Sequence, residues 1–187
     1  SPQGKILHDL FLVADGERIL IDTPSMYKAT LLKRLTMYKL RAKVSIADVS
    51  DALHVYTSFT EGLADPRHAE LPRRVYAAGE HPTLSAEAYR AVTLSLGIPD
   101  SAIDFAPDDI VAADAGYDLL HAISYTKGCY VGQEIVARMH YKQIARKGFY
   151  ILEADDAPTR LALLRFEEVM RANGVVSLDG ITYRAQL

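Results

Sequence analysis

Two Asp-Gly pairs, one towards each end of the chain, constrain the fold more than any other feature. Asp15-Gly16 separates an apolar run at residues 5–14 from an alternating segment at 18–22, and Asp179-Gly180 divides the apolar segment 175–183. Asp-Gly is a preferred two-residue turn between antiparallel strands, because both positions need positive φ. The sequence therefore predicts two β-hairpins, which favours antiparallel sheets over a doubly wound parallel sheet.

Other strands and helices are expected between these hairpins. Alternating apolar residues predict strands at 44–49, 54–59 and 146–152. Helical spacing and end signals predict a helix that Thr23 caps and that runs to Tyr38, and others at 85–96, 133–139 and 161–172. Residues 60–84, rich in Gly and Pro, are expected to form loops. The predicted class is α+β, with antiparallel sheets and flanking helices.

The bulk composition is that of an ordinary folded protein. The 187 residues are 49% hydrophobic and 24% charged, which is enough to build a buried core. The net charge of -3 gives no field that would attract nucleic acid or an anionic membrane. No apolar run approaches the length that spans a bilayer. We therefore expect neither nucleic acid nor a membrane as a partner.

The single cysteine, Cys129, limits the metal and redox chemistry that this chain can do alone. One cysteine cannot form an intramolecular disulfide, so a reducing compartment fits. Nor can it hold a four-cysteine zinc or iron–sulfur site without ligands from elsewhere. Any cluster on this thiol would have to be shared with a partner.

Cys129 lies in the segment Lys127-Gly128-Cys129-Tyr130-Val131-Gly132-Gln133-Glu134, just before the predicted helix. A helix N-terminus and the nearby ammonium of Lys127 both favour a thiolate, which suits a nucleophile, a redox thiol or a metal ligand. The alternative is a small buried cysteine that fills a gap in the core. Lys127 itself can serve this thiol, hold an anion, or be an ordinary surface lysine.

Side chains around the cysteine offer groups for a flat ligand. Tyr130 can stack on an aromatic ring, and Gln133 and Glu134 can bind amide or amino groups. The alternatives are a half-buried tyrosine and two helix-capping residues. Arg138 and His140 follow on the same segment, where His140 is a candidate ligand or base, or a structural residue.

All seven specified positions of this segment match a signature of the YgfZ family of folate-binding proteins, relatives of the glycine-cleavage T-protein. Residues 2–6, 38–44 and 65–67 also resemble segments of that family. The resemblance implies a T-protein-like folate-binding α+β domain over residues 1–154, without its N-terminal portion. It implies that residues 155–187 are a remnant of the family's C-terminal barrel domain.

The same resemblance implies a function. The chain would bind tetrahydrofolate, with Tyr130, Gln133, Glu134 and Arg138 as candidate binding residues. It would help to assemble or repair iron–sulfur clusters in client enzymes, with Cys129 and Lys127 as reactive groups. Cys129 would ligate a cluster only transiently, together with an assembly protein or client. A basic stretch at residues 23–47 could then hold the glutamate tail of folate, or be a solvated helix face.

Two other functions stay open at this point. One is a folate-dependent aminomethyltransferase like the T-protein, although the chain shows no local catalytic motif such as HExxH, a Walker loop or a Rossmann glycine loop. The other is an interaction scaffold without catalytic chemistry. Bacterial cytoplasm is the expected location, with the mitochondrial matrix as the alternative.

Overall fold

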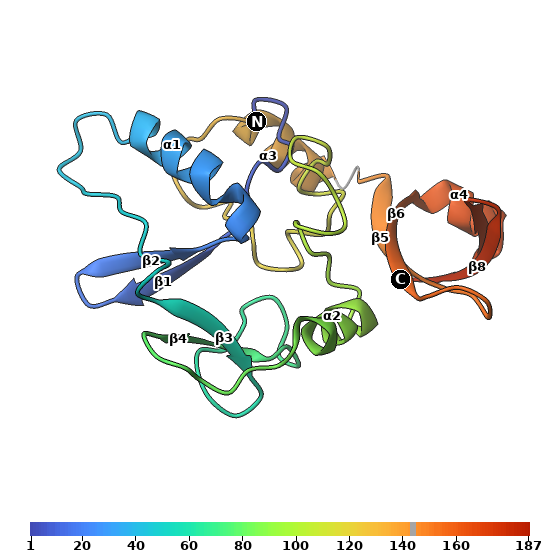
Figure 1. Ribbon diagram of the computed structural model, residues 1–187. Helices are drawn as coiled ribbons and strands as arrows, with labels where there is room; N and C mark the ends of the chain where they lie inside the picture. Colours follow the sequence, from blue (N-terminus) through green and yellow to red (C-terminus); the bar gives the residue numbers. More distant parts are fainter. Residues whose placement is uncertain (143–144) are drawn as a thin grey trace. The chain divides into compact units, whose positions relative to one another are not determined.

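The computed structural model describes residues 1–142 and 145–187 (Figure 1). The chain forms two compact units. The larger comprises residues 1–7, 65–71 and 85–187, and the smaller comprises 8–64 and 72–84. Every pairing between named strands in the described ranges is antiparallel, which confirms the predicted α+β class with antiparallel sheets.

The smaller unit is built on two antiparallel strand pairs. Strands β1 (Phe11–Asp15) and β2 (Arg18–Asp22) form the first predicted hairpin, and Gly16 in its turn has φ of +59°. Strand β3 (His54–Ser58) was also predicted, and it pairs with β4 (Arg73–Ala77). The prediction of loops at 60–84 is wrong for β4. This strand is short, and its partner lies about twenty residues earlier in the chain, where no local turn signal points to it.

A buried ion pair joins the two strand pairs of the smaller unit. The Asp22 carboxylate accepts hydrogen bonds from Arg74 Nε at 2.8 Å and from the Tyr76 hydroxyl at 3.0 Å. The side chains of Asp22 and Arg74 are only 11% and 15% exposed. The Arg74 guanidinium also lies 4.2 Å from the centre of the Phe11 ring. Strand β4, missed from the sequence, therefore supplies the cation that holds β1 and β2 in place.

This network gives Tyr76 an unusual titration, which predicts how stability changes at high pH. Burial, and then the charge of Asp22, raise the pKa of Tyr76 to about 12. The folded state thus holds the phenol proton more tightly than the unfolded chain, so this stabilisation is full below the ordinary tyrosine pKa of about 10 and is lost as the pH rises towards 12. Urea unfolding at about pH 9 and about pH 11, on either side of that ordinary value, should show a steeper loss of stability for the native chain than for Tyr76→Phe. Equal pH slopes in the two proteins would contradict the assignment.

The helical region of the smaller unit departs from the sequence prediction at both ends. A 3-10 turn, η1 (Ser25–Tyr27), comes first, and α1 (Lys28–Tyr38) begins only after it. Thr23 does not cap the helix, because its hydroxyl donates to the Asp9 carbonyl at 2.9 Å. The strand predicted at 44–49 does not form. Its alternating pattern finds no strand to pair with in the described chain, and Val44 is 53% exposed.

The larger unit contains α2 (Ala86–Ser95), held by a well-defined loop. The Ser85 hydroxyl accepts from the Ala88 amide at 3.1 Å, which confirms the predicted helix start. Arg67 bonds Asp65 through Nε at 3.0 Å and through Nη2 at 2.8 Å, and it donates to the Tyr89 hydroxyl at 2.7 Å. Arg67 is therefore a loop anchor.

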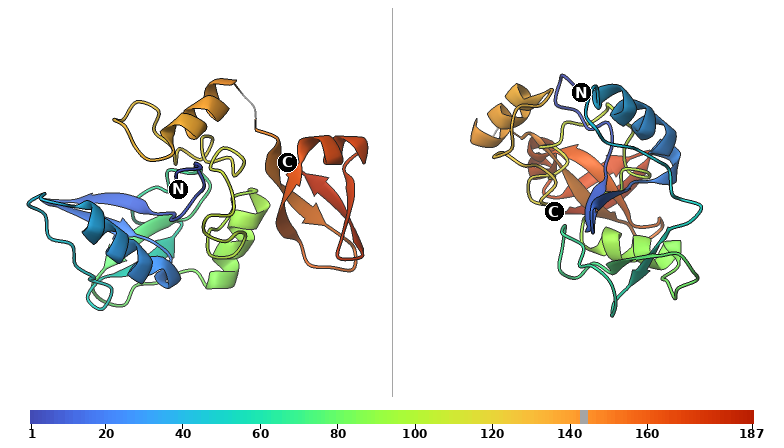
Figure 2. Two further views of the ribbon diagram at one scale, coloured as in Figure 1. Left: turned by 90° about the horizontal axis from the view of Figure 1, so that it is seen from above. Right: turned by 90° about the vertical axis from the view of Figure 1, so that its left-hand side faces the viewer.

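The C-terminal part of the larger unit is a curled four-stranded sheet with one short helix (Figures 1 and 2). Its elements are β5 (Lys147–Glu153), β6 (Arg160–Arg165), α4 (Phe166–Arg171), β7 (Val175–Leu178) and β8 (Ile181–Gln186), in the sheet order β6-β5-β8-β7. The sheet has the form of a half-barrel. The predicted boundary at residue 155 falls between β5 and β6, which are neighbours in this sheet.

Residues 161–165 belong to strand β6, so the helix predicted from Leu161 is wrong for these residues. The helix α4 begins only at Phe166. The reason is burial on both faces of the sheet. Leu161 and Leu163 face one apolar cluster with Phe149, whereas Ala162 and Leu164 face a second cluster around the fully buried Leu152. Two cores on opposite faces require side chains that alternate with period two, and this overrides the helix propensity of leucine and alanine.

Candidate functional site

The loop that carries the cysteine ends in helix α3 (Gln133–Lys142), which confirms the helix predicted there. Val136 is the buried residue of α3, and the chain turn at Gly4 packs against it. A Cβ added to Gly4 would meet Val136 Cγ2 at 3.2 Å. Residues 1–7 thus form one side of the support on which the helix and its loop rest.

Gly132 is the point at which the loop is fixed to this support. Its φ is +87°, and an added Cβ would lie 2.4 Å from the Ser1 carbonyl oxygen and 3.1 Å from the Gly4 amide nitrogen. Both contacts are with backbone, which cannot move aside as a flexible side chain can. Only glycine fits here without strain, because L side chains rarely adopt this conformation.

Cys129 lies between Gly128 and Gly132 in the sequence, and its thiol is exposed and free. A Cβ added at Gly128 would meet no atom within 4 Å, so the loop is open beside the cysteine. The alternative of a buried, gap-filling cysteine is therefore wrong. The thiol can meet a reagent or a partner without a change in the fold.

Lys127 and Tyr130 lie together in the same loop. The Lys127 ammonium is 4.5 Å from the centre of the Tyr130 ring, within the range of a cation–π contact. Burial raises the pKa of Tyr130, and its hydroxyl, although buried, has no hydrogen-bond partner among the described residues. The Tyr130 amide donates to Gln133 Oε1 at 3.4 Å, so Gln133 closes the end of the loop as a capping residue does.

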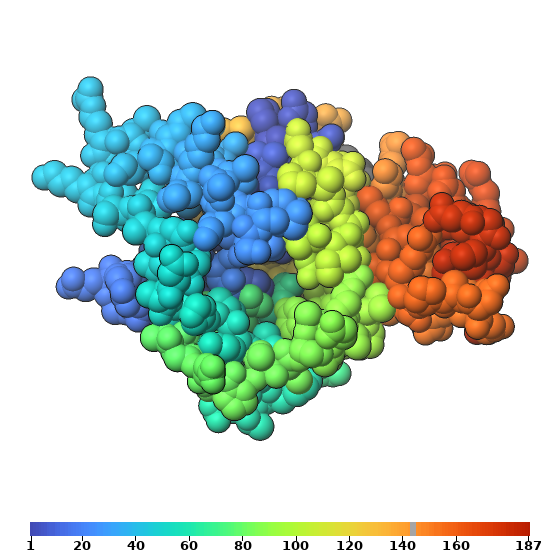
Figure 3. Space-filling view, viewed as in Figure 1, coloured from blue at the N-terminus to red at the C-terminus, as the bar shows by residue number. Residues whose placement is uncertain are grey.

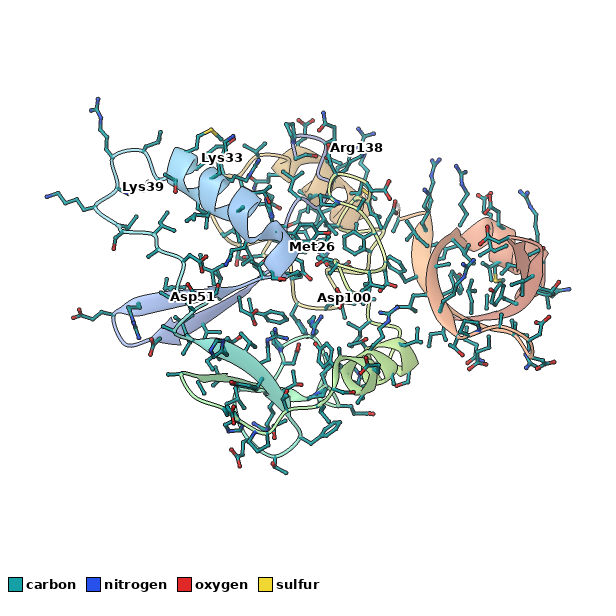
Figure 4. The ribbon with its side chains drawn as sticks, viewed as in Figure 1. Met26, Lys33, Lys39, Asp51, Asp100 and Arg138 are labelled. Atoms are coloured by element: carbon teal, nitrogen blue, oxygen red, sulfur yellow. The ribbon has the colours of Figure 1, made fainter. Side chains whose placement is uncertain are left out.

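The four residues predicted to bind folate lie on the cysteine loop and on α3. Tyr130 has a cation over its ring, and the Gln133 amide oxygen already accepts a hydrogen bond. Glu134 and Arg138 lie exposed on α3, and Figure 4 labels Arg138 there. Folate binding by these four residues therefore stays a prediction.

An open groove of about 540 Å³ lies beside the start of the loop. Its walls include Asp118, Ser124, Tyr125, Thr126 and His140. The rings of Tyr125 and His140 stack with centroids 3.7 Å apart and planes 20° apart. His140 Nδ1 lies 4.0 Å from Asp118 Oδ2. The stack holds the start of the loop against α3, as Gly132 fixes its end.

Sequence reasoning found His140 but missed the groove. Asp118 and Tyr125 lie 22 and 15 residues before His140, and no periodic spacing links the three. The described residues also contain no group of three or more His, Cys, Asp and Glu side chains placed to hold a metal ion.

The basic segment at 23–47 lies on the surface of the smaller unit (Figure 3). Lys28 pairs with Asp48 at 2.7 Å, and a hydrogen bond to that carboxylate raises the pKa of Lys28. Lys39 donates to the Val44 carbonyl at 3.0 Å. Lys33, labelled on α1 in Figure 4, is exposed, as a side chain on a solvated basic face is.

Comparison with known proteins finds similarity to relatives named as iron–sulfur cluster assembly factors. No protein-family profile matches the chain. The chain is 28% identical, over an alignment of 210 residues, to a protein of Pyricularia oryzae named "iron-sulfur cluster assembly factor IBA57 homolog, mitochondrial"; the match covers 97% of this chain and 52% of the relative. The homologue of the same name from Mycosarcoma maydis is 29% identical, with 92% and 54% covered. The mouse assembly factor IBA57 is 29% identical, with 79% and 50% covered.

The chain spans about half the length of these curated relatives. It is similar to assembly factors named as mitochondrial in fungi and mammals. No helix in residues 1–142 or 145–187 combines the length and apolar character needed to cross a membrane.

Proposed function

We propose that this chain assists the assembly or repair of iron–sulfur clusters in client enzymes, with Cys129 as its reactive group. The observation that carries the proposal is the exposed thiol on a loop fixed at both ends. The names of the relatives support the same role. A fixed loop with an open cysteine suits a thiol that acts on another protein.

A single thiolate supplies one ligand to a cluster, so the remaining ligands come from an assembly protein or a client. The cluster is cargo in this proposal. The chain contributes the position of the sulfur, on the loop just before the N-terminal end of α3. Lys127 adds a positive charge to the same loop.

The relatives' names bear on the location as well. They place those proteins in mitochondria, so we propose the mitochondrial matrix for this chain in preference to bacterial cytoplasm. We further propose that the α+β part is T-protein-like and that the curled sheet from β5 onwards corresponds to a portion of a C-terminal barrel.

Tetrahydrofolate binding is the second element of the proposal, and it is supported by the family resemblance of residues 127–134. Calorimetric titration of tetrahydrofolate should show saturable binding of equal affinity to the native chain and to Cys129→Ala, because the thiol is not part of the folate contacts in this proposal. Absence of heat with the native chain would overturn folate binding and leave the role of the cysteine to be tested separately.

An aminomethyltransferase like the T-protein is the competing function. It predicts folate-dependent turnover that survives Cys129→Ala, since that chemistry does not use the thiol. The accessory role predicts the reverse, with folate binding kept and cluster support lost. The exposed Cys129 favours the accessory role.

A further inference from the structure

We propose that the groove beside the cysteine loop binds a positively charged side chain, a guanidinium borne by a partner protein. The walls contain one carboxylate, Asp118, the hydroxyls of Ser124 and Thr126, and the stacked rings of Tyr125 and His140. Among the residues that the structure describes, no lysine or arginine lines this groove. Its chemistry is that of a hydrogen-bond acceptor next to an aromatic surface, which suits a cation.

Asp118 has unused capacity to accept hydrogen bonds. One of its carboxylate oxygens accepts from the Leu119 amide at 3.1 Å, and the other lies 4.0 Å from His140 Nδ1, beyond hydrogen-bonding distance. An ionised carboxylate offers about four lone-pair sites. The side chain is 32% exposed, so a guanidinium can reach it from solvent and form a charge-assisted hydrogen bond.

The stacked rings provide the second half of the recognition. The two rings are stacked nearly parallel at 3.7 Å, so each keeps one outer face, and arginine stacks on such a face better than lysine does. The Tyr125 hydroxyl is buried and has no hydrogen-bond partner in the described part of the chain. Burial, followed by the charge of Asp118, raises the pKa of Tyr125, which keeps this hydroxyl protonated.

The groove lies close to Cys129 in the chain, so a partner bound there would lie near the thiol. Thr126 lines the groove and lies three residues before Cys129, so the two α-carbons are within about 11 Å along the chain. An arginine of a partner, seated in the groove, would therefore bring the partner's surface to the thiol. This role rests on the proposed function, whereas the binding itself does not.

The test is a nuclear magnetic resonance titration of the full chain with three short peptides. They are identical except that the central residue is arginine, citrulline or glutamate. Citrulline has nearly the shape of arginine without its charge. The ring signals of the histidines are few, because the chain has only six, and those of His121 and His140 report on the groove. We expect saturable shifts of these two with the arginine peptide, and none with the other two peptides.

Variants locate the site. Asp118→Asn should weaken binding of the arginine peptide by about threefold or more, the range of one exposed ion pair. Tyr125→Leu should weaken it too, whereas Asp155→Asn, at an exposed carboxylate outside the groove, should not. Equal binding of the citrulline peptide, or binding unchanged by Asp118→Asn, would overturn the proposal. Binding should be the same in Cys129→Ala, so failure of the cluster role would leave this result standing.

Discussion

Replacement of Cys129 by alanine should abolish the support of iron–sulfur clusters and leave the folded chain unchanged. The thiol is exposed and free, so its removal opens no cavity and breaks no described contact. Surface changes of this kind shift stability by about 0.5 kcal/mol or less. The chemical loss is complete, because alanine has no atom that can ligate iron or exchange sulfur. The measurement is the cluster content and activity of an iron–sulfur enzyme in cells that depend on this protein.

Two further variants separate the role of sulfur from that of the loop. Cys129→Ser keeps the size and exposure of the side chain but removes the sulfur, and it should be as inactive as Cys129→Ala. Gly128→Ala, next to the thiol and with open space for its Cβ, should keep cluster support. Normal cluster content with Cys129→Ala would refute the proposed function and favour an interaction scaffold or an aminomethyltransferase.

Features that depend on short stretches of chain were predictable from the sequence. The hairpins at Asp15-Gly16 and Asp179-Gly180 form because turn and strands are adjacent. The start of α2 at Ser85 is likewise a local event, in which one hydroxyl meets an amide three residues on.

Features that depend on distant partners were not. Strand β4 forms because it pairs with β3 and because its Arg74 binds the Asp22 carboxylate. Neither partner lies next to β4 in the sequence. Residues 161–165 become a strand because the curled sheet has a core on each face. Conversely, the alternating residues 44–49 find no strand to pair with in the described ranges and form no strand themselves.

The candidate site divides in the same way. The cysteine loop and the helix after it were predictable, because glycines and a helix start mark them. The exposure of the thiol decided between two interpretations that the sequence left open. The groove was not predictable, since Asp118, Tyr125 and His140 meet only through the fold.

Gly132→Ala should destabilise the chain by about 2–4 kcal/mol, the combined cost of an unfavourable positive φ and of overpacking against rigid backbone. The same strain should move the cysteine loop away from the turn at Gly4, so cluster support should fall even where the protein stays folded. Urea unfolding measures the first effect, and the reaction rate of Cys129 with a disulfide reagent, read at a temperature where both proteins are folded, measures the second. Gly128→Ala is the matched control, because it places the same methyl group in the same loop with no atom within 4 Å. If the two variants were equally stable and equally reactive, Gly132 would not fix the loop, and the exposed thiol would owe its position to the Tyr125–His140 stack alone.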